Sequence, residues 1–325
     1  MHKSYGFFHF ACLYWPEKKI MQAEHVFMKG RNGWGIFYGL FDCLVYFTLY
    51  SVLARRMGLC VLAFSIMFNH THSLIAKVAF PVIKLFQRRL GIIYSKDYNE
   101  EHNRSGGLFK RPFGHSLKKI TKKVLACIAY IFNNPVAGKM CRYAIDSKWT
   151  LLAYYNNPNP FSKKLVKRNC RHIMRESLKV VDTIYKEGNY LNYATLKRIY
   201  NGLNSVEKAQ LTDYIISKYN FLDYKELERI YGSFDKALIA IESNAGEEYE
   251  IEDEYGDHSN YSKMISITKE CNLGDVYCES LSDQQVMRLS RLFYSKLNAS
   301  TDQIRKYLHL PSPRRQINKC HPNRP

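Results

Sequence analysis

Short apolar runs alternate with longer amphipathic runs along the first 135 residues of the chain. Three short runs, rich in β-branched and aromatic residues, predict strands: residues 24–29, 59–68 and 72–80. Three longer runs predict helices: residues 41–57, 81–101 and 117–134. Pro81 suits the first turn of its helix, and Pro135 is expected to end the last one. With a further strand in the basic segment 102–115, this order predicts an α+β fold, an antiparallel sheet with helices packed on one face.

The apolar segment 36–53 is nearly long enough to span a bilayer, but its sequence favours a helix of the protein core. Asp42 interrupts the apolar run, and Arg55 and Arg56 close it, so we expect no membrane partner. Residues 1–22 lack a clean apolar stretch before a cleavage site and are interpreted as a leader. Nine cysteines without a C-x-x-C pair indicate reduced thiols, which predicts a cytoplasmic protein.

Two histidines separated by one residue, His70 and His72, follow the second predicted strand. On a strand, residues i and i+2 share one face, so both imidazoles would point the same way. Neutral imidazoles bind divalent metals well, and the pair is a candidate for part of a metal site. The alternative is that one histidine packs in the core while the other faces solvent.

Tyr130 and Asn134 lie one helical turn apart along the edge of the predicted helix 117–134, together with Lys123. A tyrosine can act as a nucleophile on phosphorus, and an amide oxygen can join two imidazoles around a cation. The alternative for Tyr130, in a chain with 25 tyrosines, is a half-buried packing residue.

The formal net charge of +19 favours a polyanionic partner such as nucleic acid. No acidic residue occurs from position 102 to 145, where basic and aromatic side chains accumulate. We predict that a single DNA strand contacts the following residues: Arg104, Phe109, Lys110, Arg111, Phe113, Lys118, Lys119 and Lys123. The alternative is a basic face that only contacts solvent.

Several blocks of residues 23–155 resemble the REP-associated tyrosine transposases, single-tyrosine members of the HUH endonuclease class. The blocks are A-E-H-V-F-M-K-G-R-N-G at 23–33, L-A-F-S-I-M-F-N-H-T-H-S-L-I at 62–75, H-N-R-S-G-G-L-F-K-R-P-F at 102–113, Y-I-F-N-N-P-V at 130–136 and D-S-K-W-T-L-L-A-Y-Y at 146–155. The resemblance implies an HUH/RRM-like core of the ferredoxin type over residues 23–156.

By this resemblance, His70 and His72 are paired metal ligands, Asn134 is a third ligand and Tyr130 is the nucleophile. It also implies Mg²⁺ or Mn²⁺ as the metal, with no organic cofactor. The expected reaction is single-stranded DNA cleavage and strand transfer through a 5′-phosphotyrosine intermediate, at hairpin or palindromic repeat ends. A bacterial, nucleoid-associated location follows, and some family members are homodimers. The competing hypothesis is a catalytically silent DNA-binding protein that acts as a regulator.

Residues 157–270 predict a helical region that begins with a basic helix, 162–185, and contains an acidic loop, 247–257. The segments N-Y-A-T-L-K-R-I-Y-N-G at 192–202 and D-Y-K-E-L-E-R-I-Y-G-S at 223–233 indicate a pair of similar helical units. Residues 280–320 resemble a helix-turn-helix module, with helices over 283–297, from Ser300 and from Ser312. Its last helix would present Arg314, Arg315 and Lys319 to duplex DNA, although similar helical domains also occur that bind nothing.

Overall fold

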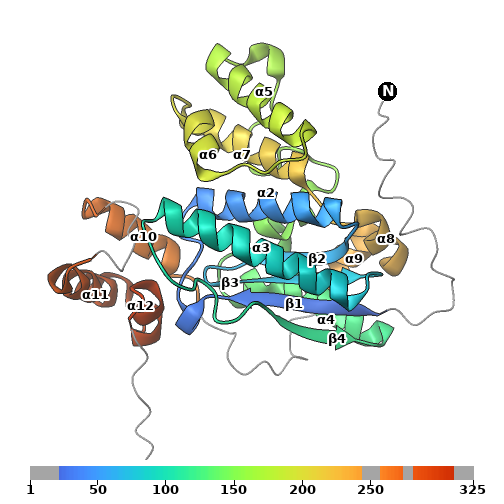
Figure 1. Cartoon of the computed structure of the whole chain (residues 1–325), viewed down its shortest axis with the longest axis horizontal. Helices are drawn as coiled ribbons and strands as arrows, with labels where there is room; N and C mark the ends of the chain where they lie inside the picture. Colours follow the sequence, from blue (N-terminus) through green and yellow to red (C-terminus); the bar gives the residue numbers. More distant parts are fainter. Residues whose placement is uncertain (1–21, 244–256, 274–280, 311–325) are drawn as a thin grey trace, which may run out of the picture.

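The computed structural model describes residues 22–243, 257–273 and 281–310. Four antiparallel strands form one sheet in the order β2-β3-β1-β4: β1 (Ala23–Lys29), β2 (Cys60–Ile66), β3 (His70–Ala76) and β4 (Gly114–Lys118). Helix α2 (Leu40–Arg56) connects β1 to β2, and α3 (Phe80–Glu101) connects β3 to β4 (Figure 1). The predicted α+β class and the antiparallel sheet are therefore confirmed.

The expectation that the helices pack on one face of the sheet is wrong. Tyr46 of α2 has its hydroxyl 2.9 Å from Oγ1 of Thr71, whereas Tyr130 of α4 (Thr121–Ala137) has its ring 5.7 Å from the ring of His72. Because neighbouring residues on a strand point to opposite faces, α2 and α4 cover opposite faces of the sheet. Strand β2 is buried at every position, which is typical of a strand covered on both sides (Figure 1).

Two boundaries around α4 differ from the prediction. Residues 114–118 form β4, so the helix begins at Thr121 rather than at position 117. The helix continues through Pro135 to Ala137, because a proline so near the end removes only one backbone hydrogen bond. The N–H of Gly138 donates to the carbonyl of Asn134 at 2.8 Å and completes the last turn.

The long basic helix predicted over 162–185 is only partly present. Helix α5 spans His172–Lys186, and the preceding residues form the 3₁₀ turn η5 (Lys167–Asn169). The N–H of Phe161 donates to Asp213, and the carbonyls of Lys163 and Lys164 accept from the side chain of Gln210. These tertiary hydrogen bonds take the place of helical ones. Between α4 and this segment lie three more 3₁₀ turns: η2 (Ala144–Asp146), η3 (Lys148–Thr150) and η4 (Leu152–Tyr154).

The two similar segments do form similar units, as predicted. Helices α6 (Tyr193–Tyr200) and α8 (Tyr224–Tyr231) each begin after a capping side chain, Asn192 or Asp223, that accepts a backbone N–H three residues later. Each is followed by a second helix, α7 (Ser205–Tyr219) or α9 (Phe234–Ser243).

The described residues after position 256 form a helical group that we call the C-terminal unit: α10 (Tyr261–Glu270), α11 (Asp283–Leu297) and α12 (Thr301–Tyr307). The predicted capping box of Ser300 and Gln303 begins α12. Although the sequence grouped α10 with residues 157–270, Met264 of α10 packs with Leu289 and Phe293 of α11. The predicted third helix with Arg314, Arg315 and Lys319, residues 247–256 of the acidic loop and residues 1–21 of the leader lie outside the described residues.

Helix α2 is a core helix, as the sequence predicted, with all residues from Asp42 to Ala54 buried. Among the helices of the described ranges, none combines the length and the apolar character needed to cross a membrane. The cysteines of the same ranges form no disulfide bonds.

A stacked pair of aromatic rings attaches the C-terminal unit to the loop after β1. The rings of Trp34 and His309 lie 4.8 Å apart and nearly parallel, and Nε1 of Trp34 donates to the carbonyl of Leu310. Nε2 of His309 lies 3.1 Å from the Gly35 carbonyl and 2.9 Å from the Tyr38 hydroxyl. Burial lowers the pKa of His309 to about 4, so its ring is neutral at pH 7.

We predict that this contact loses stability in mild acid. The unfolded chain takes up a proton on His309 near its ordinary pKa of 6.5, before the folded chain does. The contribution of His309 is therefore complete above about pH 6.5 and declines as the pH falls towards 4. The difference in unfolding free energy between wild type and His309→Gln should shrink by roughly 1–2 kcal/mol from pH 7 to pH 5 in urea titrations.

The matched control is His172→Gln, because His172 is exposed on α5. Its difference from wild type should stay nearly constant between the two pH values. A pH-independent difference for His309→Gln would show that its protonation is not linked to folding.

Candidate active site: a buried cluster of histidines and a tyrosine

Strand β3 places His70 and His72 side by side, with their ring centres 4.8 Å apart. Both imidazoles are buried, with 3% and 1% of their surface exposed. The reading of an H-x-H pair as one core and one solvent-facing histidine therefore does not hold. A buried imidazole needs hydrogen-bond partners or another ligand, which makes the neighbours of the pair informative.

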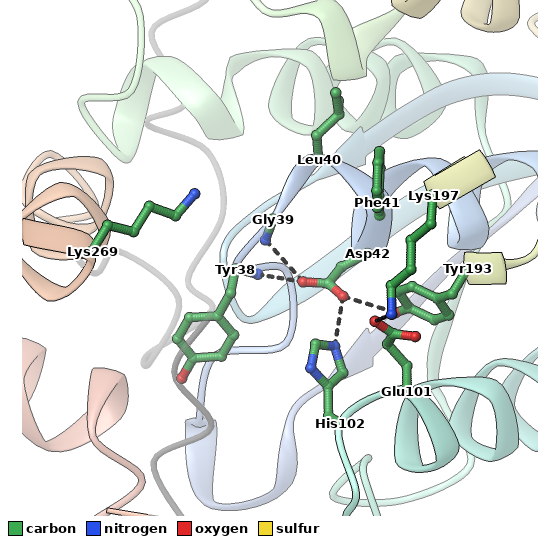
Figure 2. Close-up of a pocket in the computed structure, with 10 residues that line it drawn as sticks. All are labelled: Tyr38, Gly39, Leu40, Phe41, Asp42, Glu101, His102, Tyr193, Lys197 and Lys269. Atoms are coloured by element: carbon green, nitrogen blue, oxygen red, sulfur yellow. Dashed lines mark hydrogen bonds and ion pairs between the residues drawn. The ribbon is translucent and has the colours of Figure 1, made fainter. Parts of the chain in front are cut away.

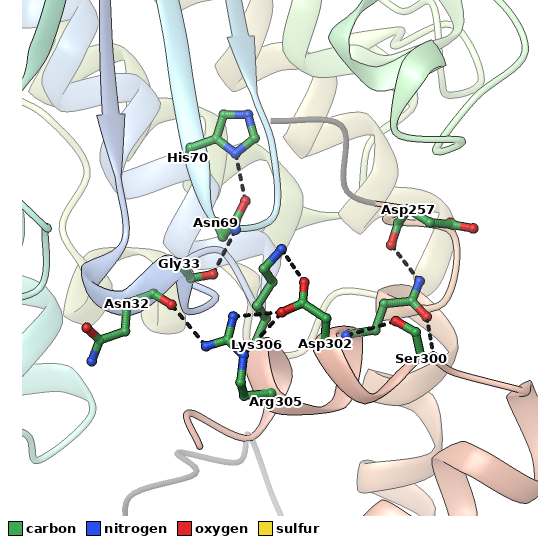
Figure 3. A network of polar contacts seen from close by, with 10 residues as sticks. Asn32, Gly33, Asn69, His70, Asp257, Ser300, Asp302, Arg305 and Lys306 are labelled. Carbon is green, nitrogen blue, oxygen red and sulfur yellow. Dashed lines mark hydrogen bonds and ion pairs between the residues drawn. The ribbon is translucent and has the colours of Figure 1, made fainter. Parts of the chain in front are cut away.

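Asn69 fixes the orientation of the His70 ring. Its amide nitrogen donates to the carbonyl of Gly33 at 2.8 Å, so its oxygen faces Nδ1 of His70, 2.6 Å away (Figure 3). An amide oxygen only accepts hydrogen bonds, which puts the hydrogen of His70 on Nδ1 and the lone pair on Nε2. That Nε2 is buried and has no hydrogen-bond partner in the described part of the chain.

His25 of β1 is a member of the cluster that the sequence did not reveal. Its Nε2 lies 2.9 Å from Nδ1 of His72, and the two rings are stacked 5.1 Å apart. His25 and Phe27 alternate within the predicted strand 24–29, which was the available signal. The register that pairs β1 with β3, in which Phe27 is opposite His72, could not be read from the sequence.

Helix α4 brings the predicted nucleophile to the same place. The ring of Tyr130 stands edge-on to two imidazoles, 5.7 Å from the centre of His72 and 5.9 Å from that of His25. Asn134 follows one turn later and is buried, with its amide nitrogen donating to the backbone carbonyl of Tyr130 at 3.0 Å. That donation leaves the amide oxygen of Asn134 as the atom that could serve as a ligand.

His258, at the start of the C-terminal unit, is a second member that the sequence did not reveal. Its ring centre lies 6.0 Å from that of His70, and its backbone N–H donates to the carbonyl of Gly138 just after α4. No local sequence pattern marks His258 as a site residue. It directly follows the acidic run and lies more than 180 residues after the H-x-H pair. Only the docking of the C-terminal unit on the sheet explains its position.

Three imidazoles of the cluster, those of His25, His70 and His258, are neutral at pH 7. Burial, followed by the neighbouring His72, lowers the pKa of His25 and of His70 well below the ordinary value. Burial also lowers the pKa of His258 to about 4. Neutral imidazole is the form that coordinates metal ions, so protons do not compete for these nitrogens at physiological pH.

The donor atoms suit a metal in type, although the described side chains are not arranged around one. No three His, Cys, Asp or Glu side chains within the described ranges stand in a metal-holding arrangement. The predicted set of His70, His72 and Asn134 contains two such side chains and an amide. The unpartnered Nε2 of His70 fits a metal ligand, because a cation would satisfy its buried lone pair.

The predicted DNA-binding residues divide into two groups, and the basic residues of the first group come from β4 and from the chain segments on either side of it. Arg111 lies over the ring of Phe27 at 5.6 Å, and that ring is 5.9 Å from His72. In β4, Ser116 is opposite His25 of β1 and Lys118 is opposite Ala23, so Lys118 lies on the same face of the sheet as His25. The charge of Lys118 helps to lower the pKa of His25. Lys110, Lys119 and Lys123, which are close to Arg111 and Lys118 in the sequence, have exposed side chains.

The remaining three predicted contacts lie away from the cluster. Arg104 donates to the side chain of Asn99 and the carbonyl of Gly107, which closes the loop after α3. Phe109 packs near Tyr94 of α3. Phe113 lies between Phe80 and His115, residues on the α3 side of the sheet. The loop between α3 and β4 therefore turns its aromatic side chains towards the core rather than towards Tyr130.

Comparison of the chain with family models, curated proteins and solved structures found no match.

Apart from the histidine cluster, a concave site of about 380 Å³ lies between α2, α3, α6 and α10. Figure 2 shows Asp42 at its centre, where the carboxylate accepts hydrogen bonds from the N–H groups of Tyr38 and Gly39. The same carboxylate accepts from Tyr193 and contacts Nε2 of His102 at 2.9 Å. These partners use the carboxylate fully, so Asp42 acts as a structural junction that caps α2 and joins it to α6.

We predict that Asn69→Ala destabilises the fold by about 1–3 kcal/mol, because it leaves the Gly33 carbonyl and the Nδ1–H of His70 buried without their partner. Urea unfolding at pH 7 measures the change. Asn157→Ala, at an exposed position, is the control and should change stability by less than about 0.5 kcal/mol. Equal losses in the two variants would mean that Asn69 does not hold the imidazole.

Proposed function

We propose that the protein is a metal-dependent enzyme that cleaves single-stranded DNA and transfers the strand through a covalent link to Tyr130. The proposal is carried by one observation, the position of the Tyr130 ring 5.7 Å from the ring of His72, with His70 on the same face of the sheet. A phenol, two imidazoles and an amide thus come together from segments more than 50 residues apart in the sequence.

The fold is consistent with the resemblance seen in the sequence. The order β-α-β-β-α-β with an antiparallel sheet of order β2-β3-β1-β4 matches a ferredoxin-like split βαβ core. In the proposed enzyme this core corresponds to the HUH domain. Helix α4 follows the core and carries Tyr130 across the face opposite to α2 and α3.

His70, His72 and the amide oxygen of Asn134 would hold a divalent cation, Mg²⁺ or Mn²⁺. When bound, such a cation would polarise the scissile phosphate and stabilise the charge that develops on it. Asn69 and His25 would orient the two imidazoles through their Nδ1 atoms. Imidazole-rich sites favour Mn²⁺ over Mg²⁺, because imidazole is a softer donor than carboxylate or water.

The proposed reaction exchanges one phosphoester bond for another. The phenol oxygen of Tyr130 attacks phosphorus, the bond from phosphorus to the 3′ oxygen breaks, and the proton of the phenol balances the proton gained by that oxygen. The products are a 5′-phosphotyrosine and a free 3′-hydroxyl. A 3′-hydroxyl from another strand then attacks the phosphotyrosine and releases the phenol, so no nucleoside triphosphate is consumed.

A basic surface next to the cluster supports DNA as the substrate. Arg111 stacks over Phe27, and this pair offers a cation and a ring to an unpaired strand beside His72. The stretch of residues 102–145 contains no acidic residue and supplies further cations. Hairpin or palindromic repeat ends remain the predicted substrates.

The second candidate function is a DNA-binding protein without catalytic activity. Burial of the cluster favours it, because Tyr130 is only 3% exposed and a phosphate cannot reach a covered phenol. In the enzyme, a cover over the cluster would have to open when DNA binds. The rival predicts binding to DNA without any covalent adduct.

We predict that Tyr130→Phe abolishes the covalent adduct with a single-stranded oligonucleotide in the presence of Mn²⁺, a decrease of at least roughly 1,000-fold. Binding of the oligonucleotide should change less than about threefold, because the hydroxyl contributes to attack rather than to the basic surface. Denaturing gel electrophoresis measures the adduct, and fluorescence anisotropy measures the binding.

Tyr143→Phe is the matched control, since Tyr143 is an exposed tyrosine just after α4. It should form the adduct at the wild-type rate. Adduct formation by Tyr130→Phe would reject Tyr130 as the nucleophile, and wild-type protein that binds DNA but never forms an adduct would favour the silent regulator.

We predict that Arg111→Ala weakens binding to single-stranded DNA several-fold and lowers the slope of log affinity against log salt by about 0.7, the loss of one phosphate contact. Arg88→Ala is the control because Arg88 is an exposed arginine on α3, on the other side of the sheet. Equal effects of the two variants would indicate that the cations around Phe27 have no special part in binding.

A further inference from the structure

The C-terminal unit brings a further imidazole, that of His258, close to His70. His258 is buried, and its backbone N–H is bound to the carbonyl of Gly138 at 2.9 Å. The N–H of Gly138 in turn bonds to the carbonyl of Asn134, so His258 lies where α4 ends, one turn beyond the predicted amide ligand. Its ring faces His70, with the ring centres 6.0 Å apart and the planes at 74°.

Two buried ring nitrogens in this pair have no hydrogen-bond partner within the described residues: Nε2 of His70 and Nδ1 of His258. An unsatisfied buried polar atom costs about 1–3 kcal/mol, so two of them on neighbouring rings call for a physical explanation. Asn69 already places the lone pair of His70 on Nε2. In the tautomer of His258 that has its lone pair on Nδ1, a cation would accept a lone pair from each of the two imidazoles.

We propose that His258 is a metal ligand together with His70, so that one metal ion joins the C-terminal unit to strand β3. The proposal rests on the metal site of the proposed function and adds to it a ligand from a distant part of the chain. The other coordination positions of this ion would belong to oxygen donors, such as the Asn134 amide and a phosphate of the substrate, because no three His, Cys, Asp or Glu side chains of the described ranges are arranged around one metal.

The chemistry of the donors selects the metal. Two neutral imidazoles without a carboxylate favour Co²⁺, Ni²⁺ or Zn²⁺ over Mg²⁺. Lys29 and Lys306 lie close enough for their charges to help lower the pKa of His70. Lys306 forms an ion pair with Asp302, and Arg305 of the same helix donates to the carbonyl of Asn32 (Figure 3). An anionic phosphate on the metal would offset the positive charge of the surroundings.

Titration of the full chain with Co²⁺, followed by its visible absorption, tests the proposal without DNA. His70→Ala and His258→Phe should each weaken Co²⁺ binding at least about tenfold, whereas His172→Ala, at an exposed position, should leave it unchanged. Without metal, His258→Phe should be as stable as wild type or more stable, because an apolar ring replaces an unsatisfied imidazole. Wild-type Co²⁺ affinity in His258→Phe would overturn the proposal.

A second measurement covers the case in which His258→Phe does not fold. In wild-type protein labelled with ¹⁵N-histidine, Zn²⁺ should shift the Nδ1 resonance of His258 and the Nε2 resonance of His70. An unshifted His258 resonance, with that of His70 shifted, would also overturn the proposal.

The outcomes separate this proposal from the proposed function. If Co²⁺ binding depends on His70 but not on His258, and the Tyr130 adduct still forms, the ligand assignment fails and the enzyme remains. If binding depends on His258 but no adduct forms on Tyr130, the metal site stands and the transferase fails.

Discussion

Strand β3 carries polar side chains into the interior of the protein, and this constraint shapes the structure around it. His70, Thr71, His72 and Ser73 are all buried, because helices cover both faces of the sheet. Buried polar groups are tolerated only when they have partners. Two of those partners come from other segments of the chain, Tyr46 for Thr71 and His25 for His72, and the third, Asn69, is the residue just before His70.

The buried polar side chains on the two faces of β3 have different surroundings. On the side of α2, the hydroxyls of Tyr46 and Thr71 lie 2.9 Å apart among apolar side chains. On the side of α4, the imidazoles of β1, β3 and the C-terminal unit gather next to Tyr130 and leave the Nε2 of His70 without a partner. A core built only for stability would replace such groups with apolar ones. In the proposed enzyme, a metal ion would take up the lone pair of that His70 nitrogen.

The sequence predicted what short-range patterns determine. The periods of the apolar residues gave the antiparallel α+β sheet, the core helix α2 and the paired helices α6 and α8, and the H-x-H spacing gave two imidazoles on one face. The sequence did not predict that helices cover both faces of the sheet. The amphipathic pattern of α4 is the same whichever face of the sheet the helix packs on. His25 and His258 were missed since strand register and the docking of the C-terminal unit depend on contacts between distant residues. Phe109 and Phe113 were misplaced because an aromatic residue in a basic loop can turn inward as readily as outward.

The metal is the part of this interpretation that distinguishes a catalytic site from a satisfied core. Anomalous diffraction from crystals of the full chain soaked in Co²⁺ tests it most directly. A catalytic metal site predicts one strong anomalous peak within bonding distance of the Nε2 of His70, on the side that faces Tyr130 and His258. A well-ordered site with no peak there at saturating Co²⁺, or with only a water molecule between the imidazoles, would contradict it.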